Sequence, residues 1–258
     1  MNILSINNQK GGVGKTTVSV NMAITFAQAG YRVLVVDNDK QGNATTFFGV
    51  KILDDTMTLA DLYTDDTMTV ADVVQHTHYE RLDILPSDID LKAAELALPQ
   101  QNATWQTVLR QKLAMSESDY DICLIDNPPD ASALVMNSLT CCNTALVIVG
   151  PDEFSINGVK TIRKLMDAAA AYNPALHGMA IFNKYKPAGG VAQSLYAQRI
   201  QEIMPVLPVS LRNSNPGRHD RINFVEWAMN DGKAVFEVSP GCGFARDFVN
   251  VMNALMEG

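Results

Sequence analysis

The amino-acid sequence predicts a single α/β domain whose mostly parallel, twisted sheet is flanked by helices on both faces. Short apolar runs rich in valine and isoleucine alternate with longer segments of helical periodicity, which is typical of strands buried between two layers of helices. The chain has 258 residues, of which 47% are hydrophobic and 19% are charged, so one substantial core can form. No internal repeat or glycine- and serine-rich linker divides it. One domain therefore accounts for residues 1–258.

Strands are expected where apolar runs are short and bounded by polar or turn-forming residues: Asn2–Ile6, Arg32–Asp37, Leu82–Leu85, Ile122–Asp126, Ala145–Val149 and Met179–Phe182. Helices are expected in the longer periodic segments: Lys15–Gln28, Leu91–Leu98, Trp105–Met115, Ile156–Ala171, Val191–Ile203, Arg221–Met229 and Gly243–Met256. The segment Lys51–Asp72 is acidic and weakly patterned. We interpret it as a short surface excursion with one or two helices.

Composition narrows the class of protein. The start MNILSINNQ lacks the basic and apolar regions of a signal peptide, and no stretch reaches the roughly 18 apolar residues that span a bilayer. We therefore expect a soluble, cytoplasmic protein. The net charge of −8 argues against a strongly basic nucleic-acid binder, so any DNA contact must be local and weak.

The cysteines do not predict a metal or redox site. The four of them, Cys123, Cys141, Cys142 and Cys242, form no CxxC pair and have no histidine-rich companion segment. We expect most of them to be small core residues.

A glycine-rich segment after the first expected strand indicates a phosphate-binding loop. The strand runs into KGGVGKTT and then into an apolar helix, which is the strand-loop-helix context of a P-loop NTPase. Backbone N–H groups of such a loop and the helix N-terminus surround phosphate oxygens. The amine of Lys15 should reach the β- and γ-phosphates and the Thr16 hydroxyl should ligate Mg²⁺. The predicted nucleotide-binding residues are Gly11, Gly12, Val13, Gly14, Lys15, Thr16 and Thr17, and the predicted cofactors are ATP and Mg²⁺.

Carboxylates follow two of the other expected strands. Asp37 and Asp39 come at the carboxyl end of the second strand, where a position beside the P-loop favours chemistry over a solvated turn. Asp126 ends the apolar strand Ile122–Asp126 and would hold Mg²⁺ through water.

These segments resemble the motifs of the ParA/MinD family of P-loop ATPases. KGGVGKTT resembles its deviant Walker A box, DNDKQGNAT from Asp37 to Thr45 resembles its D-x-D-P-Q-G-N-A-T segment, and DNPP from Asp126 resembles its D-x-P-P tail. The resemblance implies that Lys10 crosses a dimer interface to the partner's nucleotide and that Asp39 orients the attacking water. Lys10, Lys15 and Asp39 are therefore the predicted catalytic residues. Asp37 matches a family residue near the magnesium shell, so Thr16, Asp37 and Asp126 are the predicted metal-site residues. Lys40 departs from the family, which usually has proline there, and this puts the basal hydrolysis rate in doubt.

The resemblance also suggests where the base binds. Asn183 follows the last expected strand and matches the family's asparagine for the adenine edge, while Leu207–Arg212, with Pro208, resembles the loop that closes over it. Asp152 matches an acidic position near the nucleotide. Because no helix-turn-helix segment precedes the P-loop, the sequence is similar to the short, Soj-type ParA proteins.

The function implied by this resemblance is an ATP-driven partition or cargo-positioning ATPase. Its expected partners are a second copy of the chain in the ATP state, nonspecific DNA, and a ParB-like centromere-binding or adaptor protein that stimulates a weak basal activity. The protein would then be nucleoid-associated when it holds ATP. The expected DNA contacts are arginines of the C-terminal half: Arg212, Arg218, Arg221 and Arg246.

Two alternatives stay open at this stage. A MinD-like membrane-cycling regulator needs a basic amphipathic C-terminal helix, but Phe244–Gly258 has a single arginine, and its apolar stripe is expected to pack on the domain. We therefore expect no membrane partner. A relative of the nitrogenase iron protein would hold an iron–sulfur cluster with two thiolates per chain, and the adjacent Cys141 and Cys142 do not match that pattern.

Overall fold

The computed structural model describes residues 1–101, 103–150, 153–185, 195–213 and 224–257. An eight-stranded sheet in the order β3-β4-β2-β5-β1-β6-β7-β8 forms its centre, and only β3 runs antiparallel to its neighbour. The strands are β1 (Asn2–Asn7), β2 (Val33–Asp37), β3 (Gln75–His76), β4 (Leu82–Leu85), β5 (Ile122–Asp126), β6 (Thr144–Val149), β7 (His177–Tyr185) and β8 (Val206–Arg212). The predicted α/β fold with a mostly parallel sheet is confirmed.

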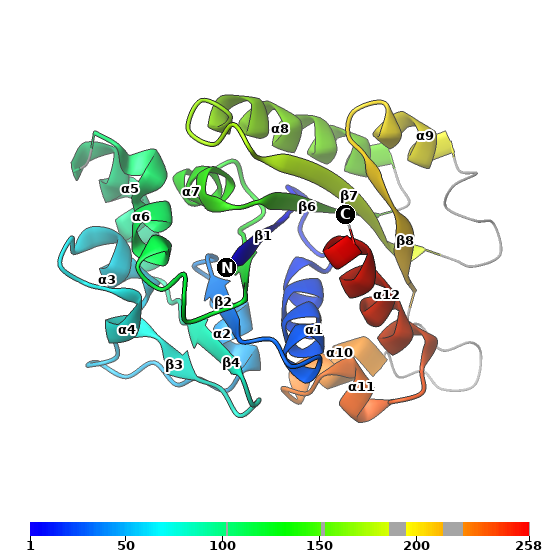
Figure 1. Ribbon diagram of the computed structural model, residues 1–258, viewed down its shortest axis with the longest axis horizontal. Coiled ribbons are helices and arrows are strands. Elements are labelled where there is room, and N and C mark those ends of the chain that lie inside the picture. The colour runs from blue at the N-terminus through cyan, green and yellow to red at the C-terminus, as the bar shows by residue number, and fades with distance from the viewer. Residues whose placement is uncertain (102, 151–152, 186–194, 214–223, 258) are drawn as a thin grey trace.

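The helices connect the strands and cover both faces of the sheet (Figure 1). In chain order they are α1 (Lys15–Gln28), α2 (Asn43–Phe47), α3 (Leu59–Thr64), α4 (Val70–Val73), α5 (Leu91–Gln101), the 3₁₀ helix η1 (Trp105–Thr107), α6 (Val108–Ala114), α7 (Ala133–Cys141), α8 (Glu153–Ala169), α9 (Leu195–Gln201), α10 (Phe224–Asn230), α11 (Val235–Val238) and α12 (Gly243–Glu257). Among the described residues, no helix has the length and apolar character needed to cross a membrane.

The two faces of the sheet have separate cores because side chains alternate along each strand. In β6, Leu146 and Ile148 pack in one core with residues of α1, α2 and α10 to α12, whereas Val147 and Val149 pack in the other with α7, α8 and α9. Helices α3 to α6 extend this second layer over β2 and β5. Strands buried on both faces explain why the strand sequences read as continuous apolar runs.

The parallel register brings the sequence motifs to one edge of the sheet. Strand β5 lies between β1 and β2, with Asp126 opposite Ile6 on one side and Asp37 on the other. The carboxyl ends of these three strands therefore meet, and the loop after β1 leads directly into α1. This edge positions the candidate site.

Most of the predicted elements are confirmed, and two differences have clear causes. The expected loop Leu207–Arg212 is wrong, because this segment is part of β8, an edge strand parallel to β7. Pro208 lacks an N–H group, which an edge strand tolerates, and the pairing shifts register between Ala180 and Phe182. Helix α7 has no counterpart among the expected helices. Its polar Asn137, Ser138 and Thr140 are buried, so it has no polar face to give a helical pattern.

Two smaller expectations concern the surface excursion and the cysteines. The excursion Lys51–Asp72 contains α3 and the start of α4, as expected. Of the cysteines, Cys123 and Cys142 are buried as expected, whereas Cys141 and Cys242 are only partly buried. Parts of two expected helices, residues 191–194 and 221–223, lie outside the described residues.

Candidate functional site

The loop between β1 and α1 is shaped for a close approach of its backbone to an anion. Gly12 and Gly14 have φ angles of 73° and 93°, in the left-handed region that favours glycine. The first-turn N–H groups of α1 have no intrahelical acceptor and carry the positive end of the helix dipole. Lys10 is exposed at the start of the loop, and its N–H donates to Asn8 Oδ1 over 2.6 Å. The loop therefore offers a concentration of N–H donors.

Lys15 lies at the first position of α1 with its side chain turned inward. The residue is only 8% exposed. Burial lowers the pKa of its amine, and the charges of Asp126, Asp39 and Asp130 oppose that shift. A buried cation beside the helix N-terminus is suited to an anionic group that enters the loop.

The carboxylate of Asp126 is buried, and among the described residues only one of its two oxygens has a hydrogen-bond partner. Ser19 Oγ donates to Asp126 Oδ1 over 2.8 Å, while Oδ2 has no hydrogen-bond partner among the described residues. Burial raises the pKa of Asp126 to about 6, an effect opposed by the Thr16 and Ser19 hydroxyls and by Lys15. A buried carboxylate oxygen without a donor, beside a threonine hydroxyl, is a hard oxygen ligand of the kind that Mg²⁺ binds.

Asp37 is the second buried acid of this edge. It is fully buried, and Thr45 donates to Asp37 Oδ2 from both its N–H and its hydroxyl, each over 2.7 Å. Burial and the nearby charge of Asp126 raise the pKa of Asp37 to about 7, although the Thr45 hydrogen bonds oppose the rise. Asp37 thus lies next to Asp126 in the sheet, and its Oδ2 accepts two hydrogen bonds from Thr45.

Asp39 lies in the turn that follows β2 and is 7% exposed. The N–H of Gln41 donates to its Oδ1 over 3.0 Å, and the carbonyl oxygen of Asp39 accepts from Gly42 N at 2.9 Å and from Ser87 Oγ at 3.0 Å. The turn is tight against the chain before α5, because a Cβ at Gly42 would come within 2.8 Å of the Ser87 carbonyl oxygen. The backbone that carries Asp39 is held on two sides.

Two buried asparagines join the loops that carry these acids. Asn38 Nδ2 donates to Asn127 Oδ1 over 2.9 Å, and the Tyr63 hydroxyl of α3 donates to Asn38 Oδ1 over 3.0 Å. Asn127 Nδ2 donates in turn to Ser5 Oγ of β1 over 2.9 Å. Both asparagines are at most 1% exposed. This hydrogen-bonded chain fixes β1, β2 and β5 relative to one another.

A cavity of about 330 Å³ opens beside the glycine loop, between the ends of β7 and β8 and helices α10 and α12. Asn183 lines it and donates from Nδ2 to the carbonyl oxygen of Val13 over 2.8 Å, while Lys184 Nζ donates to the carbonyl oxygen of Gly12 over 2.8 Å. A Cβ at Gly14 would meet Asn183 Nδ2 at 2.7 Å. The predicted base residue is therefore in direct contact with the phosphate loop.

The structure does not bring every predicted site residue to this cavity. Pro208 is exposed in β8 and is not among the residues that line the cavity. Three predicted residues, Asp152, Arg218 and Arg221, lie outside the described residues. Arg246 is exposed on α12, where its Nη2 donates to the carbonyl oxygen of Gly241 over 3.2 Å.

Arg212, one of the predicted DNA contacts, forms an ion pair within the chain, and its side chain is 39% exposed. Its guanidinium donates to both oxygens of the buried Asp247 on α12, from Nε and Nη2, each over 2.7 Å. A Cβ at Gly243 would overlap this guanidinium, so the glycine leaves room for it. This ion pair joins β8 to α12, and Arg212 also lines the cavity. Removing Arg212 would leave the buried Asp247 carboxylate unpaired.

The sequence interpretation missed residues that the fold brings to the site. Ser19 lies four residues after Lys15, one helical turn away on the same face of α1, and this spacing could have identified it. Asp130 follows the two prolines after Asn127 and acts on the amine of Lys15 by its charge. Lys184 had no sequence signal of its own beyond its place next to Asn183.

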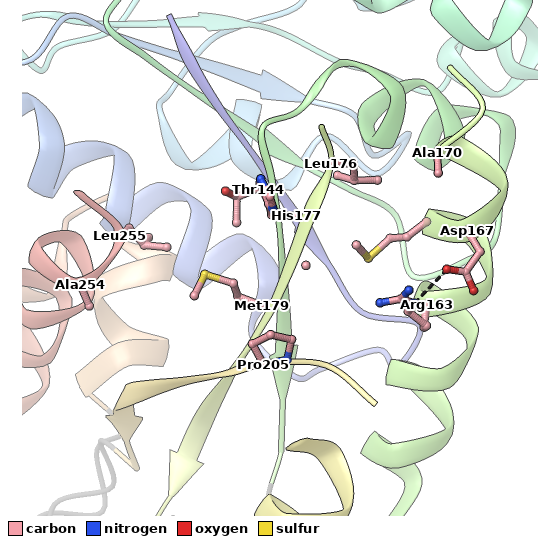
Figure 2. Close-up of a pocket in the computed structure, with 12 residues that line it drawn as sticks. Thr144, Arg163, Asp167, Ala170, Leu176, His177, Met179, Pro205, Ala254 and Leu255 are labelled. Carbon is pink, nitrogen blue, oxygen red and sulfur yellow. Dashed lines mark hydrogen bonds and ion pairs between the residues drawn. The ribbon is translucent and has the colours of Figure 1, made fainter. Parts of the chain in front are cut away.

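A second cavity, of about 460 Å³, lies away from these motifs (Figure 2). Thr144 and His177, the first residues of β6 and β7, line it, so it lies at the amino ends of the strands, opposite the P-loop edge. Its charged groups Arg163 and Asp167 face each other on α8 and form an ion pair of 2.9 Å. We assign the candidate chemistry to the P-loop edge.

Known proteins share this arrangement. A family model described as an AAA domain matches residues 1–177. An uncharacterised protein of Methanocaldococcus jannaschii is 31% identical over 246 residues, which cover 92% of this chain and 91% of the archaeal protein. The sporulation initiation inhibitor protein Soj of Bacillus subtilis is 37% identical over 160 residues, and the chain spans 62% of its length, with 62% of this chain matched.

Among solved structures, apo McdA of Cyanothece matches with a TM-score of 0.83 at 22% identity, over 99% of both chains. The same protein has also been solved as a variant in complex with ATP. At that identity the likeness establishes the fold.

Proposed function

This chain belongs to the ParA/MinD family of P-loop ATPases, and from that premise we propose that it is a dimerising ATPase that positions DNA or another cargo. In its ATP state it binds DNA without sequence preference, and hydrolysis stimulated by a ParB-like partner releases it. The observation that carries the proposal is the meeting of three groups at one sheet edge: the buried amine of Lys15, the unpartnered oxygen of Asp126 and the carboxylate of Asp39.

The described residues fit ATP and Mg²⁺. The loop Gly11–Gly14 and the first turn of α1 with Thr17 supply N–H donors for the phosphates, and Lys15 neutralises charge on the β- and γ-phosphates. Thr16 would ligate Mg²⁺ and the unpartnered Asp126 oxygen would hold it through water, with Asp37 next to Asp126 in the sheet. When bound, Mg²⁺ supplies positive charge against the transferring phosphoryl group. The cavity lined by Asn183 has room for the base.

Hydrolysis in this proposal uses two further residues. Asp39 accepts a hydrogen bond from the attacking water and orients it, a role that the held backbone of its turn supports. Lys10 is exposed beside the phosphate loop, and it adds positive charge to the nucleotide of the other subunit. Because that charge arrives only when two subunits meet, ATP binding and dimerisation are coupled.

The proposed DNA-binding surface consists of the predicted arginines Arg212, Arg218, Arg221 and Arg246. They give each monomer few cations, whereas an ATP dimer doubles them and makes binding avid. The test is fluorescence anisotropy of a labelled duplex of arbitrary sequence. We expect binding only with ATP, and a loss of about 100-fold between 50 and 200 mM salt if roughly four phosphates are contacted.

The matched variant for this test replaces Arg218 and Arg221 by glutamate, with the exposed Lys51→Glu as the charge control. The double variant should lose DNA binding and keep ATP hydrolysis, while the control should keep both. Equal DNA affinity with and without ATP, or unchanged affinity of the double variant, would remove DNA from the mechanism.

The membrane-cycling alternative is less well supported. Helix α12 buries its apolar residues Phe244, Phe248 and Val251 in the core it shares with α1 and β8. A helix that inserts its apolar face into a bilayer would have to leave this packing. The packed face favours the DNA-bound proposal.

The buried acids predict a pH-dependent stability of the nucleotide-free protein. Because the folded-state pKa of Asp126 is raised from 3.8 to about 6, the folded state favours the protonated acid. The stability that the protonated acid contributes is present at low pH and is lost as the pH rises from 3.8 towards 6. Asp126→Asn removes this titrating group. As the pH rises from 4 to 8, its free energy of unfolding should therefore increase by about 1–3 kcal/mol relative to that of the wild type.

Chemical denaturation at both pH values measures this gain, with the half-exposed Asp130→Asn as the matched control. A difference between Asp126→Asn and wild type that is the same at pH 4 and pH 8 would contradict the prediction. With Mg²⁺ and nucleotide the order should reverse, because the charged wild-type carboxylate attracts Mg²⁺ and the neutral amide does not.

A further inference from the structure

Lys40 occupies a position from which it can hold the Asp39 turn. Its amine lies 3.8 Å from Glu95 Oε2 on α5 and 3.5 Å from Asp130 Oδ2 in the loop after β5. The Lys40 side chain is 25% exposed and that of Glu95 only 14%. One cation thus links three segments that are distant in sequence: the turn after β2, the loop after β5 and helix α5.

The two carboxylates that contact Lys40 lie in places where a positive charge is favourable. Glu95 is a largely buried acid on an otherwise apolar helix face, and such a charge needs a partner. Asp130 also acts by its charge on Lys15, so it lies near the phosphate loop. An amine that pairs with both acids offsets part of their charge and ties their segments to the Asp39 turn.

The turn itself shows why a restraint is needed at this residue. Gly42 N–H donates to the Asp39 carbonyl oxygen over 2.9 Å, which makes Lys40 the second residue of a four-residue turn. Proline is favoured at that place because its ring fixes φ. Lysine leaves φ free, so the backbone loses a restraint that an ion pair can replace.

We propose that Lys40 is a positioning residue that fixes the Asp39 turn through its ion pairs with Glu95 and Asp130, and so keeps the Asp39 carboxylate in place for hydrolysis. The role in hydrolysis rests on the proposed ATPase function, whereas the restraint on the turn belongs to the nucleotide-free protein. The two parts can therefore be tested separately.

The first test is hydrogen exchange of the nucleotide-free protein, read on the amides of Gln41 and Gly42. Lys40→Met keeps the length of the side chain and removes its charge, and it should speed exchange at both amides about three- to fivefold, as expected for losing a partly exposed ion pair. Glu95→Gln should act in the same direction, and Lys40→Arg should restore slow exchange. Lys92→Met, an exposed lysine on the same helix α5, is the matched control and should change nothing.

The second test separates binding from turnover. Lys40→Met should lower kcat for ATP hydrolysis about three- to fivefold and leave the ATP affinity within about twofold, because the restraint serves the transition state. The double variant Lys40→Met, Glu95→Gln should be no slower than Lys40→Met alone, since both changes break one contact. Lys40→Arg should recover kcat.

Three results would overturn the proposal. Unchanged exchange in Lys40→Met would show that the ion pairs do not restrain the turn. Faster exchange with unchanged kcat would show that the restraint has no part in hydrolysis. If the kcat losses of the two single variants multiplied in the double variant, Lys40 and Glu95 would act independently of each other. If the wild-type protein hydrolysed no ATP, the proposed function would fail while the exchange measurement still decided whether Lys40 holds the turn.

Discussion

Replacing Lys15 by glutamine is expected to abolish measurable ATP binding at micromolar nucleotide. The amine is 8% exposed and surrounded by the charges of Asp126, Asp39 and Asp130. Without it, the phosphates would enter a loop with three nearby acids and no buried cation to balance them. Losing a charge-assisted contact costs about 1.5–3 kcal/mol, or roughly a 10- to 150-fold loss of affinity, and the uncompensated acids add to the loss.

Isothermal titration with ATP and Mg²⁺ measures this effect, and Lys92→Gln on the exposed side of α5 is the control. If the ATP affinity of Lys15→Gln stayed within about threefold of wild type, the loss of affinity would be smaller than that expected for any charge-assisted hydrogen bond. That result would place the phosphates elsewhere in the molecule. Circular dichroism and thermal melting distinguish a folding defect from a binding defect, which is necessary because Lys15→Gln leaves the buried Asp126 carboxylate without its nearby cation.

Asp39→Ala is expected to stop turnover while ATP still binds. The carboxylate acts on the attacking water, so its loss raises the barrier without removing a phosphate contact, and we expect kcat to fall at least about 100-fold. The variant should therefore accumulate as an ATP-bound dimer, which light scattering detects. Stimulated hydrolysis at the wild-type rate would show that another residue positions the water.

Adding Lys10→Ala to Asp39→Ala tests the contact across the dimer. The trapped dimer should dissociate to monomers that still bind ATP, because Lys10 is proposed to serve only the other subunit's nucleotide. Lys184→Ala is a useful comparison, since that amine donates to Gly12 of its own chain. If the double variant remained dimeric, Lys10 would have no role across the interface.

The elements that could be predicted from the sequence are those whose structure depends on residues adjacent in the chain. Helix α1 has the expected bounds because a glycine loop precedes it and an apolar face follows, and β5 is a continuous apolar run that ends in Asp126. The parallel sheet then brings Asp37 next to Asp126 without further information. Motif spacing and strand burial together were enough to predict the P-loop edge.

The parts that were missed depend on contacts between distant segments. The pair of Arg212 and Asp247 joins residues that are 35 positions apart, and Ser19 meets Asp126 across 107 positions. Nothing near Pro208 in the sequence says that its segment pairs with β7, because proline argues against a strand. Helix α7 was invisible for a related reason, since a helix buried on all sides shows no alternation of polar and apolar residues.

The chain of amides through Asn38 and Asn127 has a consequence for how this protein can diverge. Asn38 donates to Asn127 Oδ1 inside the protein, so an apolar replacement of Asn38 removes that donor from a buried oxygen. Replacing both asparagines also takes their amide partners from the Tyr63 hydroxyl and Ser5 Oγ. Loss of these amides in a diverging sequence therefore calls for compensating changes at the residues that they contact.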